Sequence, residues 1–243
     1  MTRQTTSLNE YPVWDRTTRW FHWINVLCVF CLLGLGTVIL YASDLGATND
    51  GKIILKTTHV VVGYVFVLNL LWRIVWGFVG GPYSRWSAVL PGGRGFMQAL
   101  KRHLRDFSNG DSQPHPGHSP GGRIAVSIIF LALLVQGSSG LVLAGTDVYM
   151  PPFGGYIATW VASPDKDPAA VRPYAPDTVN EQSYDEMRAF RKPFIGTHKN
   201  SYYFILALIV LHIAAVIFTE VREGGSIVSA MFTGRKTLPK EPE

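Results

Sequence analysis

Cysteine is scarce in this sequence, and the two cysteines that occur, Cys28 and Cys31, form a C-x-x-C spacing within an apolar segment. No histidine follows them, so the spacing fits neither a redox-active dithiol motif nor a motif for covalent haem attachment. Charge is also scarce, because 16% of the residues are charged and 47% are hydrophobic. Internal repeats and low-complexity tracts are absent. A composition this apolar argues against an ordinary soluble domain.

Four long apolar segments explain this composition. They lie within predicted spans of about 18–41, 58–79, 123–145 and 200–221. The apolar part of each is about 18 to 22 residues long, enough to cross a hydrocarbon core about 30 Å thick. A soluble all-helical bundle would need polar stripes with a period of 3.6 residues, and these segments are apolar nearly all round. We therefore predict an all-α membrane protein, a four-transmembrane-helix bundle forming one domain over residues 1–243.

Charge in the connections predicts the orientation of this bundle. The connection 80–122 is basic, with Arg85, Arg94, Lys101, Arg102 and Arg105 against Asp106 and Asp111. The connection 146–198 carries seven acidic and five basic residues. Because basic connections stay in the cytoplasm, we expect both termini and connection 80–122 to be cytoplasmic, and connection 146–198 to be periplasmic, in a bacterial inner membrane. The net charge of +5 then reflects topology, and we expect no nucleic-acid partner.

Three shorter features add to this prediction. The first span follows a polar start without a small-residue cleavage site, so we expect an uncleaved anchor rather than a signal peptide. Residues 94–107 have the pattern of a helix lying on an anionic membrane surface, although a solvated connector would also fit. Its apolar face comprises Phe96, Met97, Leu100, Leu104 and Phe107. Connection 146–198 is rich in proline and aromatic residues, which predicts an ordered external cap.

Four of the seven histidines lie at the ends of the apolar segments or within them: His22, His59, His198 and His212. An ionisable residue at membrane depth marks a functional site by default, although a single one is as often a hydrogen-bonded core residue. At about 1.5 Å per residue, His198 and His212 lie about 21 Å apart along one helix and roughly on one face. With the topology above, His59 shares the external depth of His198, and His22 lies nearest the depth of His212.

Two imidazoles from facing helices suit a haem iron bound from both sides. We therefore predict two b-type haems, the cytoplasmic-side iron bound by His22 and His212 and the periplasmic-side iron bound by His59 and His198. Zinc or copper would need three or four ligands converging on one point. A proton relay would usually add carboxylates, and none lies deep in the spans.

Haem propionates need cations. Arg16 and Arg19 precede the first histidine, and Arg73 lies at the depth of the cytoplasmic-side haem. A buried arginine without an anion is costly, so we expect these three arginines to contact propionates. The alternative for Arg73 is to reach the cytoplasmic surface. Lys199 or Arg191 would serve the periplasmic-side haem.

Small residues in the spans would let a flat macrocycle approach the backbone. The glycines concerned are Gly34, Gly36, Gly63, Gly137 and Gly140. Glycine is common in membrane helices in any case, so this signal alone is weak.

These residues resemble the four-helix di-haem cytochrome b subunits of nickel-iron hydrogenases and formate dehydrogenases and their prokaryotic b-561-type relatives. The matching stretches are VWDRTTRWFHW (13–23), THVVVGY with LLWRIVWGFVGGPYSR (58–85), GHSPGG (117–122), and VREGGSIVSAMFTGRK (221–236). The histidine spacing matches as well, and the resemblance implies the same two histidine pairs. It covers nearly the whole chain apart from connection 146–198, which is longer here.

The resemblance also implies a quinone site beside the cytoplasmic-side haem. GHSPGG resembles the family's GHNP segment at the start of the third span. His118 and Ser119 are therefore expected to contact the quinone head and to pass protons, with serine standing where asparagine is common.

Together these expectations describe an electron-transfer subunit of a quinone-linked oxidoreductase complex in the respiratory chain. Electrons would enter from a periplasmic redox protein, namely a hydrogenase small subunit, another iron-sulfur subunit or a c-type cytochrome. They would cross both haems to the membrane quinone, and connection 146–198 would dock or shield the partner. Two other functions stay open: a stand-alone quinone oxidoreductase that uses a small soluble donor, and a membrane anchor of a redox complex. A homo-oligomer also stays open.

Overall fold

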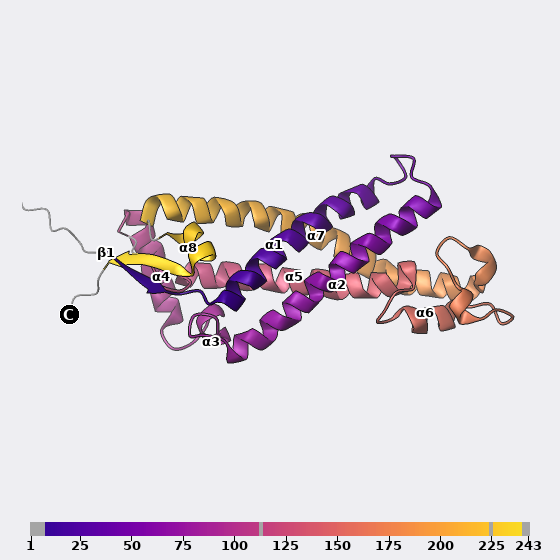
Figure 1. Ribbon diagram of the computed structural model, residues 1–243, viewed down its shortest axis with the longest axis horizontal. Coiled ribbons are helices and arrows are strands. Elements are labelled where there is room, and N and C mark those ends of the chain that lie inside the picture. The colour runs from indigo at the N-terminus through magenta and orange to yellow at the C-terminus, as the bar shows by residue number, and fades with distance from the viewer. Residues whose placement is uncertain (1–7, 112–113, 224–225, 240–243) are drawn as a thin grey trace, which may run out of the picture. The chain divides into compact units, whose positions relative to one another are not determined.

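Four long helices dominate the structure, a computed structural model that describes residues 8–111, 114–223 and 226–239 (Figure 1). They are α1 (Arg16–Leu40), α2 (Asn49–Val79), α5 (Pro120–Val148) and α7 (Glu181–Glu223). Each is long and apolar enough to cross a membrane. The prediction of four membrane-spanning helices is therefore confirmed in length and composition.

Side-chain caps explain where these helices begin. In each case an oxygen at the residue before the helix accepts a hydrogen bond from the backbone N–H three residues later, which satisfies one of the unpaired donors of the first turn. The capping residues are Asp15, Thr48, Ser119 and Asn180. For α2 and α7 these caps lie well upstream of the apolar segments, so both helices extend beyond the predicted spans.

Shorter helical elements lie between the long helices and after the last of them. They are α3 (Trp86–Val89), α4 (Phe96–Asn109), α6 (Gly154–Val161), the 3-10 turns η1 (Pro168–Ala170) and η2 (Pro176–Thr178), and α8 (Ile227–Thr233). The predicted helix over 94–107 corresponds to α4. Its Phe107 packs against Phe218 of α7, with ring centroids 5.6 Å apart. Met97 and Leu104 of the same helix stay exposed.

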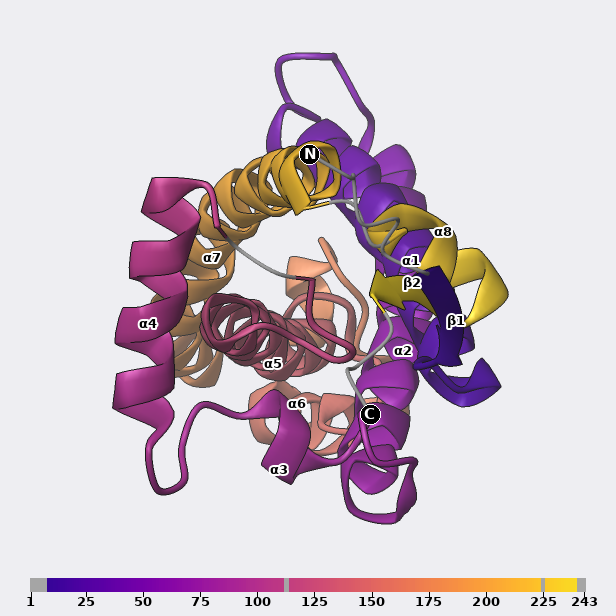
Figure 2. The same ribbon diagram turned by 90° about the vertical axis from the view of Figure 1, so that its left-hand side faces the viewer.

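A two-stranded sheet joins segments from near the two ends of the chain, which the sequence analysis did not predict. Strand β1 (Leu8–Pro12) pairs antiparallel with β2 (Arg235–Pro239), and Tyr11 lies opposite Lys236. The strands lie side by side next to α8 (Figure 2). Five-residue strands separated by the whole chain carry too weak an alternating pattern to be recognised from the sequence alone. The class is therefore all-α in its spans, with one short sheet added.

The chain divides into two compact units. Unit 1 comprises Met1–Trp23, Leu70–Leu131 and Leu206–Glu243, and unit 2 comprises Ile24–Asn69 and Ala132–Ile205. Each long helix contributes residues to both units. The predicted ligands His22 and His212 belong to unit 1, whereas His59 and His198 belong to unit 2.

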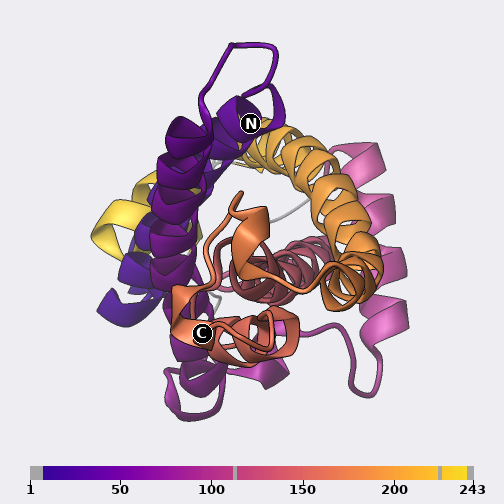
Figure 3. The ribbon, with the colours of Figure 1, turned by 90° about the vertical axis from the view of Figure 1, so that its right-hand side faces the viewer.

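In unit 2, the segment between α5 and α7 is ordered and has a core of its own. Val161 of α6 and Met187 of α7 are fully buried there, beside Ile157, Ala158 and Val171. An isolated bridge pairs Ala162 with Val179. Figure 3 shows this segment facing the viewer. The expectation of an ordered cap agrees with this packing.

Candidate functional site

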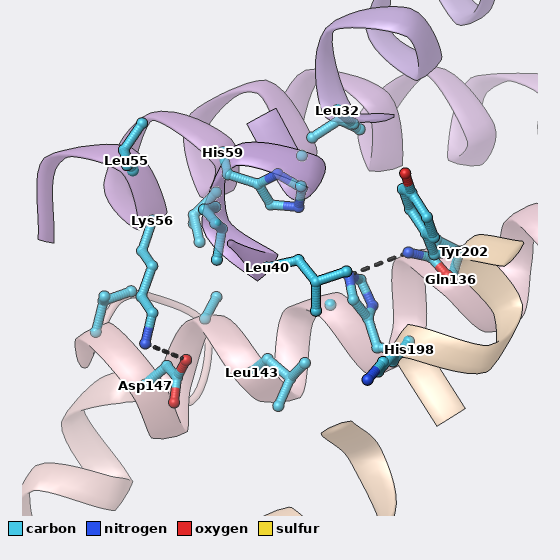
Figure 4. A pocket seen from close by; sticks show the side chains of 18 of the residues that line it. Leu32, Leu40, Leu55, Lys56, His59, Gln136, Leu143, Asp147, His198 and Tyr202 are labelled. Carbon is cyan, nitrogen blue, oxygen red and sulfur yellow. Dashed lines mark hydrogen bonds and ion pairs between the residues drawn. The ribbon is translucent and has the colours of Figure 1, made fainter. Parts of the chain in front are cut away.

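In unit 2, His59 of α2 and His198 of α7 lie close together. Their ring centroids are 6.2 Å apart and the ring planes are inclined at 73°. Figure 4 shows both rings at one cavity, with Lys56 and Asp147 on one side and Tyr202 on the other. Two helices far apart in the sequence therefore bring one imidazole each to the same cavity.

This spacing fits two ligands on opposite sides of one metal ion. A coordinating imidazole nitrogen lies about 2 Å from the metal and about 1 Å from its own ring centroid, so two such rings have centroids about 6 Å apart. Among the described residues, no group of three or more His, Cys, Asp or Glu side chains is placed to hold a metal ion. The pair thus fits a cofactor that supplies its metal's remaining ligands itself, as haem does.

The cavity around this pair has a volume of about 590 Å³, within the range of about 300 to 1,000 Å³ typical of small-molecule and cofactor sites. Most of the residues that line it are apolar. Its charged lining residues are Lys52, Lys56, Asp147 and Lys199. The Nζ atom of Lys56 lies 2.8 Å from Asp147, and Arg191 of α7 pairs with the same carboxylate.

Two of the glycines considered above lie against the histidine rings. A Cβ on Gly36 of α1 would lie 3.6 Å from Cε1 of His59, and a Cβ on Gly140 of α5 would lie 3.2 Å from Cε1 of His198. The second distance is shorter than ordinary van der Waals contact, so a side chain at position 140 would require the His198 ring or α5 to shift slightly. Gly34 and Gly63 have no such neighbour within 4 Å among the described residues.

In unit 1, His22 of α1 and His212 of α7 lie close enough to interact electrostatically. The His22 ring packs edge-on against Trp23 at a centroid distance of 5.1 Å. Its Nδ1 atom is buried and has no hydrogen-bond partner within the described ranges. A buried polar atom without a partner is costly in a folded protein.

Arg73 of α2 is also in unit 1 and is only 7% exposed. Its side chain therefore does not extend to the surface, which was the alternative to a propionate contact. One of its nitrogens donates to the carbonyl oxygen of Ser84 at 3.0 Å. Its guanidinium lies 4.7 Å from the centroid of the Trp86 ring and 5.9 Å from that of Phe21. Nη1 is buried and, within the described part of the chain, unpartnered. A buried cation with a spare donor fits an anion such as a propionate.

Asp15 is the acidic residue that acts on Arg73 electrostatically. It accepts hydrogen bonds from Ser84 Oγ at 2.6 Å, from the backbone of Thr18 at 2.7 Å and from Trp76 Nε1 at 3.2 Å. Burial tends to raise the pKa of Asp15, but these hydrogen bonds outweigh it and hold the pKa below its ordinary value. Asp15 therefore stays ionised and in place beside the arginine.

The other two predicted propionate ligands have different surroundings. Arg16 is exposed. Arg19 donates to the carbonyl oxygen of Phe232, which fixes it to the end of α8, while its Nε atom is buried without a partner in the described residues. Of the three arginines, Arg73 is the most enclosed.

His118 lies just before α5 in unit 1, and its ring packs against Trp14 at a centroid distance of 4.8 Å. Its pKa is lowered to about 4, first by burial and then by nearby groups that carry positive charge. Those groups are Lys236, Arg73 and Arg123. The imidazole is therefore neutral near pH 7 and lies in positive surroundings that would attract an anion or a polarised carbonyl oxygen.

Ser119, the second predicted quinone ligand, caps α5. Its Oγ accepts the backbone N–H of Gly122 at 3.1 Å, and Pro120 occupies the first helical position, where its missing N–H costs nothing. The hydroxyl hydrogen stays available for donation, because the cap uses only a lone pair.

Lys236 of β2 holds the turn that precedes α5. Its Nζ donates to the carbonyl oxygens of His115 at 3.0 Å and Gly117 at 3.1 Å. Burial lowers the pKa of Lys236 to about 8, opposed by the charges of Glu223 and Glu220. The sequence analysis did not single out this lysine, because its partners are backbone atoms more than a hundred residues away.

The sequence analysis also missed three polar residues around His198. They are Gln136, Ser139 and Ser201. Gln136 and Ser139 lie in the otherwise apolar third span, three positions apart and hence on one helix face. Because polar residues are rare in membrane spans and often mark functional sites, Gln136 could have been recognised from the sequence as a candidate site residue.

Comparisons with known proteins point to one family. The family model described as prokaryotic cytochrome b561 matches residues 13–234. A probable Ni/Fe-hydrogenase B-type cytochrome subunit of Cupriavidus necator is 23% identical, over 96% of this chain and 89% of that protein. The similarly named subunit of Bradyrhizobium diazoefficiens is 22% identical, over 92% of this chain and 85% of that protein.

A shorter match agrees with these two. A probable Ni/Fe-hydrogenase 1 B-type cytochrome subunit of Escherichia coli K12 is 27% identical, over 59% of this chain and 64% of that protein. No solved structure matches the chain significantly. The family model covers most of the chain, the four spans agree with it, and the resemblance seen in the sequence is confirmed. The chain therefore belongs to the prokaryotic cytochrome b561 family, a membrane electron-transfer family that binds haem b.

Proposed function

We propose that this cytochrome carries electrons across a bacterial inner membrane, between a periplasmic redox protein and the membrane quinone, through two bis-histidine b haems. The observation that supports this most directly is the ring pair of His59 and His198, because its 6.2 Å spacing suits two imidazoles that would bind one iron. Haem supplies the one-electron chemistry when bound, and the chain supplies ligands, charge and exclusion of water.

In unit 2, His59 and His198 would hold the periplasmic-side haem in the cavity that they line. Two lysines at this cavity, Lys52 and Lys199, are suited to its propionates, whereas Lys56 already pairs with Asp147. Arg191 is already engaged by Asp147, so we no longer expect it to serve a propionate.

In unit 1, His22 and His212 would hold the cytoplasmic-side haem, and Arg73 would be its main propionate partner. The spare buried donor of Arg73 supports this role. Arg19 would contribute through its unpartnered Nε, and Arg16 would act from the exposed end of α1.

The quinone would bind near the start of α5, where His118 and Ser119 present polar hydrogens. The neutral imidazole of His118 and the free hydroxyl hydrogen of Ser119 can each donate to a quinone carbonyl. The positive charges of Lys236, Arg73 and Arg123 around His118 favour the charge that develops on a reduced quinone. Protons would come from the cytoplasm, which is the side we expect both termini and connection 80–122 to face.

The redox partner would dock on the periplasmic side. The relatives named above are hydrogenase cytochrome subunits, which favours a hydrogenase small subunit over a c-type cytochrome. The ordered segment between α5 and α7 would form part of the docking surface. The relative reduction potentials of partner and quinone would set the direction of electron flow.

Haem stoichiometry tests this proposal. The purified chain is expected to contain two haems, with the absorption spectrum of low-spin bis-imidazole iron. His198→Ala should remove one haem and spare the other, and His22→Ala should remove the other one. A colourless protein, or the loss of both haems from either variant in folded protein, would contradict the proposal. Quinone reduction by the isolated chain with a small soluble donor would favour the stand-alone oxidoreductase instead.

A further inference from the structure

Both ring nitrogens of His198 have hydrogen-bond partners from other side chains of unit 2. Nδ1 lies 3.0 Å from Oγ of Ser139, and Nε2 lies 3.1 Å from Nε2 of Gln136. Ser139 is only 4% exposed. By contrast, Nδ1 of His59 is buried without a partner among the described residues. Of the two facing rings, only the one on α7 thus has described partners that could select its tautomer.

The contacts of Ser139 assign the proton on Nδ1. Its Oγ also lies 2.8 Å from the carbonyl oxygen of Val135 and 3.1 Å from that of Gln136. A carbonyl oxygen only accepts, and a hydroxyl has a single hydrogen to donate. That hydrogen goes to the shorter contact, the Val135 carbonyl one helical turn back, so Ser139 has only a lone pair to offer the ring. Nδ1 must then carry the hydrogen.

Gln136 gives the same assignment independently. The single hydroxyl hydrogen of Ser201 goes to Gln136 Oε1, the shorter of its two contacts, and not to the His198 carbonyl oxygen 3.2 Å away. The amide nitrogen of Gln136 is thereby directed toward Nε2 of His198. An amide nitrogen only donates, so Nε2 must present a lone pair. Two side chains one helical turn apart on α5 therefore select the tautomer with hydrogen on Nδ1 and a lone pair on Nε2.

We propose that Ser139 is a positioning residue for the periplasmic-side haem: it accepts the Nδ1 hydrogen of His198 and so holds the Nε2 lone pair ready for the iron. This inference rests on the proposed function, because it takes His198 to be an axial ligand. Until haem binds, the amide nitrogen of Gln136 donates a hydrogen bond to this lone pair. A histidine ligand that donates its second nitrogen's hydrogen is oriented by that bond and becomes more basic.

The hydrogen bond from His198 to Ser139 should lower the reduction potential of the periplasmic-side haem and leave that of the other haem unchanged. A more basic imidazole stabilises ferric over ferrous iron, so loss of the acceptor should raise the midpoint potential of the periplasmic-side haem. A tenfold change in the ratio of the oxidised to the reduced form corresponds to about 59 mV for one electron. We expect Ser139→Ala to change this ratio several-fold and to weaken haem retention by about 10- to 100-fold.

The experiment is a spectroelectrochemical titration of the full chain in detergent, using only protein that retains both haems. Ser139→Ala is compared with Ser139→Thr, which keeps the hydroxyl, and with Ser138→Ala. Ser138 is the matched control, because it is exposed and bonds only to the Leu134 carbonyl in the described structure. Low-spin ferric signals in electron paramagnetic resonance provide a second reading of the ligand field.

We expect Ser139→Ala to raise one of the two potentials and to shift one ferric signal, while Ser139→Thr and Ser138→Ala match the wild type. If Ser139→Ala leaves both potentials and both signals unchanged in a wild type that holds two haems, the inference is wrong and the proposed function stands. If the wild type lacks the haem of His59 and His198, both are wrong. An equal shift at both haems would indicate a general structural effect and would also overturn the inference.

Discussion

Arg73 is the buried residue that most directly suggests a haem propionate, because its Nη1 has no partner among the described residues. Replacing it with Met should lower the midpoint potential of the cytoplasmic-side haem, because an unpaired propionate charge disfavours the more negative ferrous state. We expect a change of about tenfold in the ratio of oxidised to reduced haem, about 59 mV. A redox titration in detergent measures it. Arg85→Met, at an exposed arginine, is the control and should have no effect; equal potentials in Arg73→Met and the wild type would rule out the propionate role.

The lowered pKa of His118 should make the stability of the folded chain depend on pH. Its pKa in the folded chain is about 4 and its ordinary value is 6.5, so between these values the unfolded chain binds a proton that the folded chain does not. Stability should therefore fall as the pH drops from 7 to 5, by about 2 kcal/mol from this residue. Thermal unfolding in detergent at both pH values measures it.

Two variants isolate the contribution of His118. His118→Asn should flatten this part of the pH dependence, whereas His103→Asn, on α4, should retain it. An unchanged pH dependence in His118→Asn would show that the imidazole is charged in the folded protein, contrary to its burial.

At the scale of helices, the approach of α5 to α7 depends on Gly140. Gly140→Ala places a methyl group 3.2 Å from Cε1 of His198, so the ring or the helix must shift. We expect partial loss of the periplasmic-side haem, with the other haem retained. Pyridine haemochrome content per chain measures the loss.

Two other glycines supply graded controls for this substitution. Gly36→Ala, where the distance to His59 is 3.6 Å, should be nearly neutral, and Gly34→Ala should match the wild type. Equal haem content in all three variants would mean that the ring can move freely.

The helices also illustrate what the sequence reveals. Hydropathy predicts the four spans, because lipid requires apolar side chains on most of the helix surface. It does not predict that α7 begins at Glu181, because that extension is polar and is stabilised by the Asn180 cap and by packing of Met187. Likewise, helix geometry predicts the pairing of histidines by depth, whereas the hydrogen bonds of Gln136 and Ser139 depend on rotamers that no spacing specifies.

At the scale of the whole chain, β2 connects the C-terminal region to the predicted quinone site. Lys236→Met removes the donor to the carbonyls of His115 and Gly117, so the turn before α5 loses two hydrogen bonds that hold it to β2. We expect slower oxidation of the reduced haems by a quinone analogue, by about tenfold, with both haems retained. Stopped-flow absorbance measures the rate. Arg235→Met removes only an exposed ion pair with Glu10, so its oxidation rate should match that of the wild type. If Lys236→Met and Arg235→Met give the same rate, β2 has no effect on the quinone site.

The pairing of β1 with β2 also has a consequence for biosynthesis. Leu8–Pro12 is translated before all four spans, but its partner Arg235–Pro239 is translated only after them. The sheet, and with it the anchoring of the turn before α5 by Lys236, can therefore form only after the last span has been translated. In a nascent chain that stops before this strand, all four spans would be present, but the turn before α5 would lack its hydrogen bonds from Lys236.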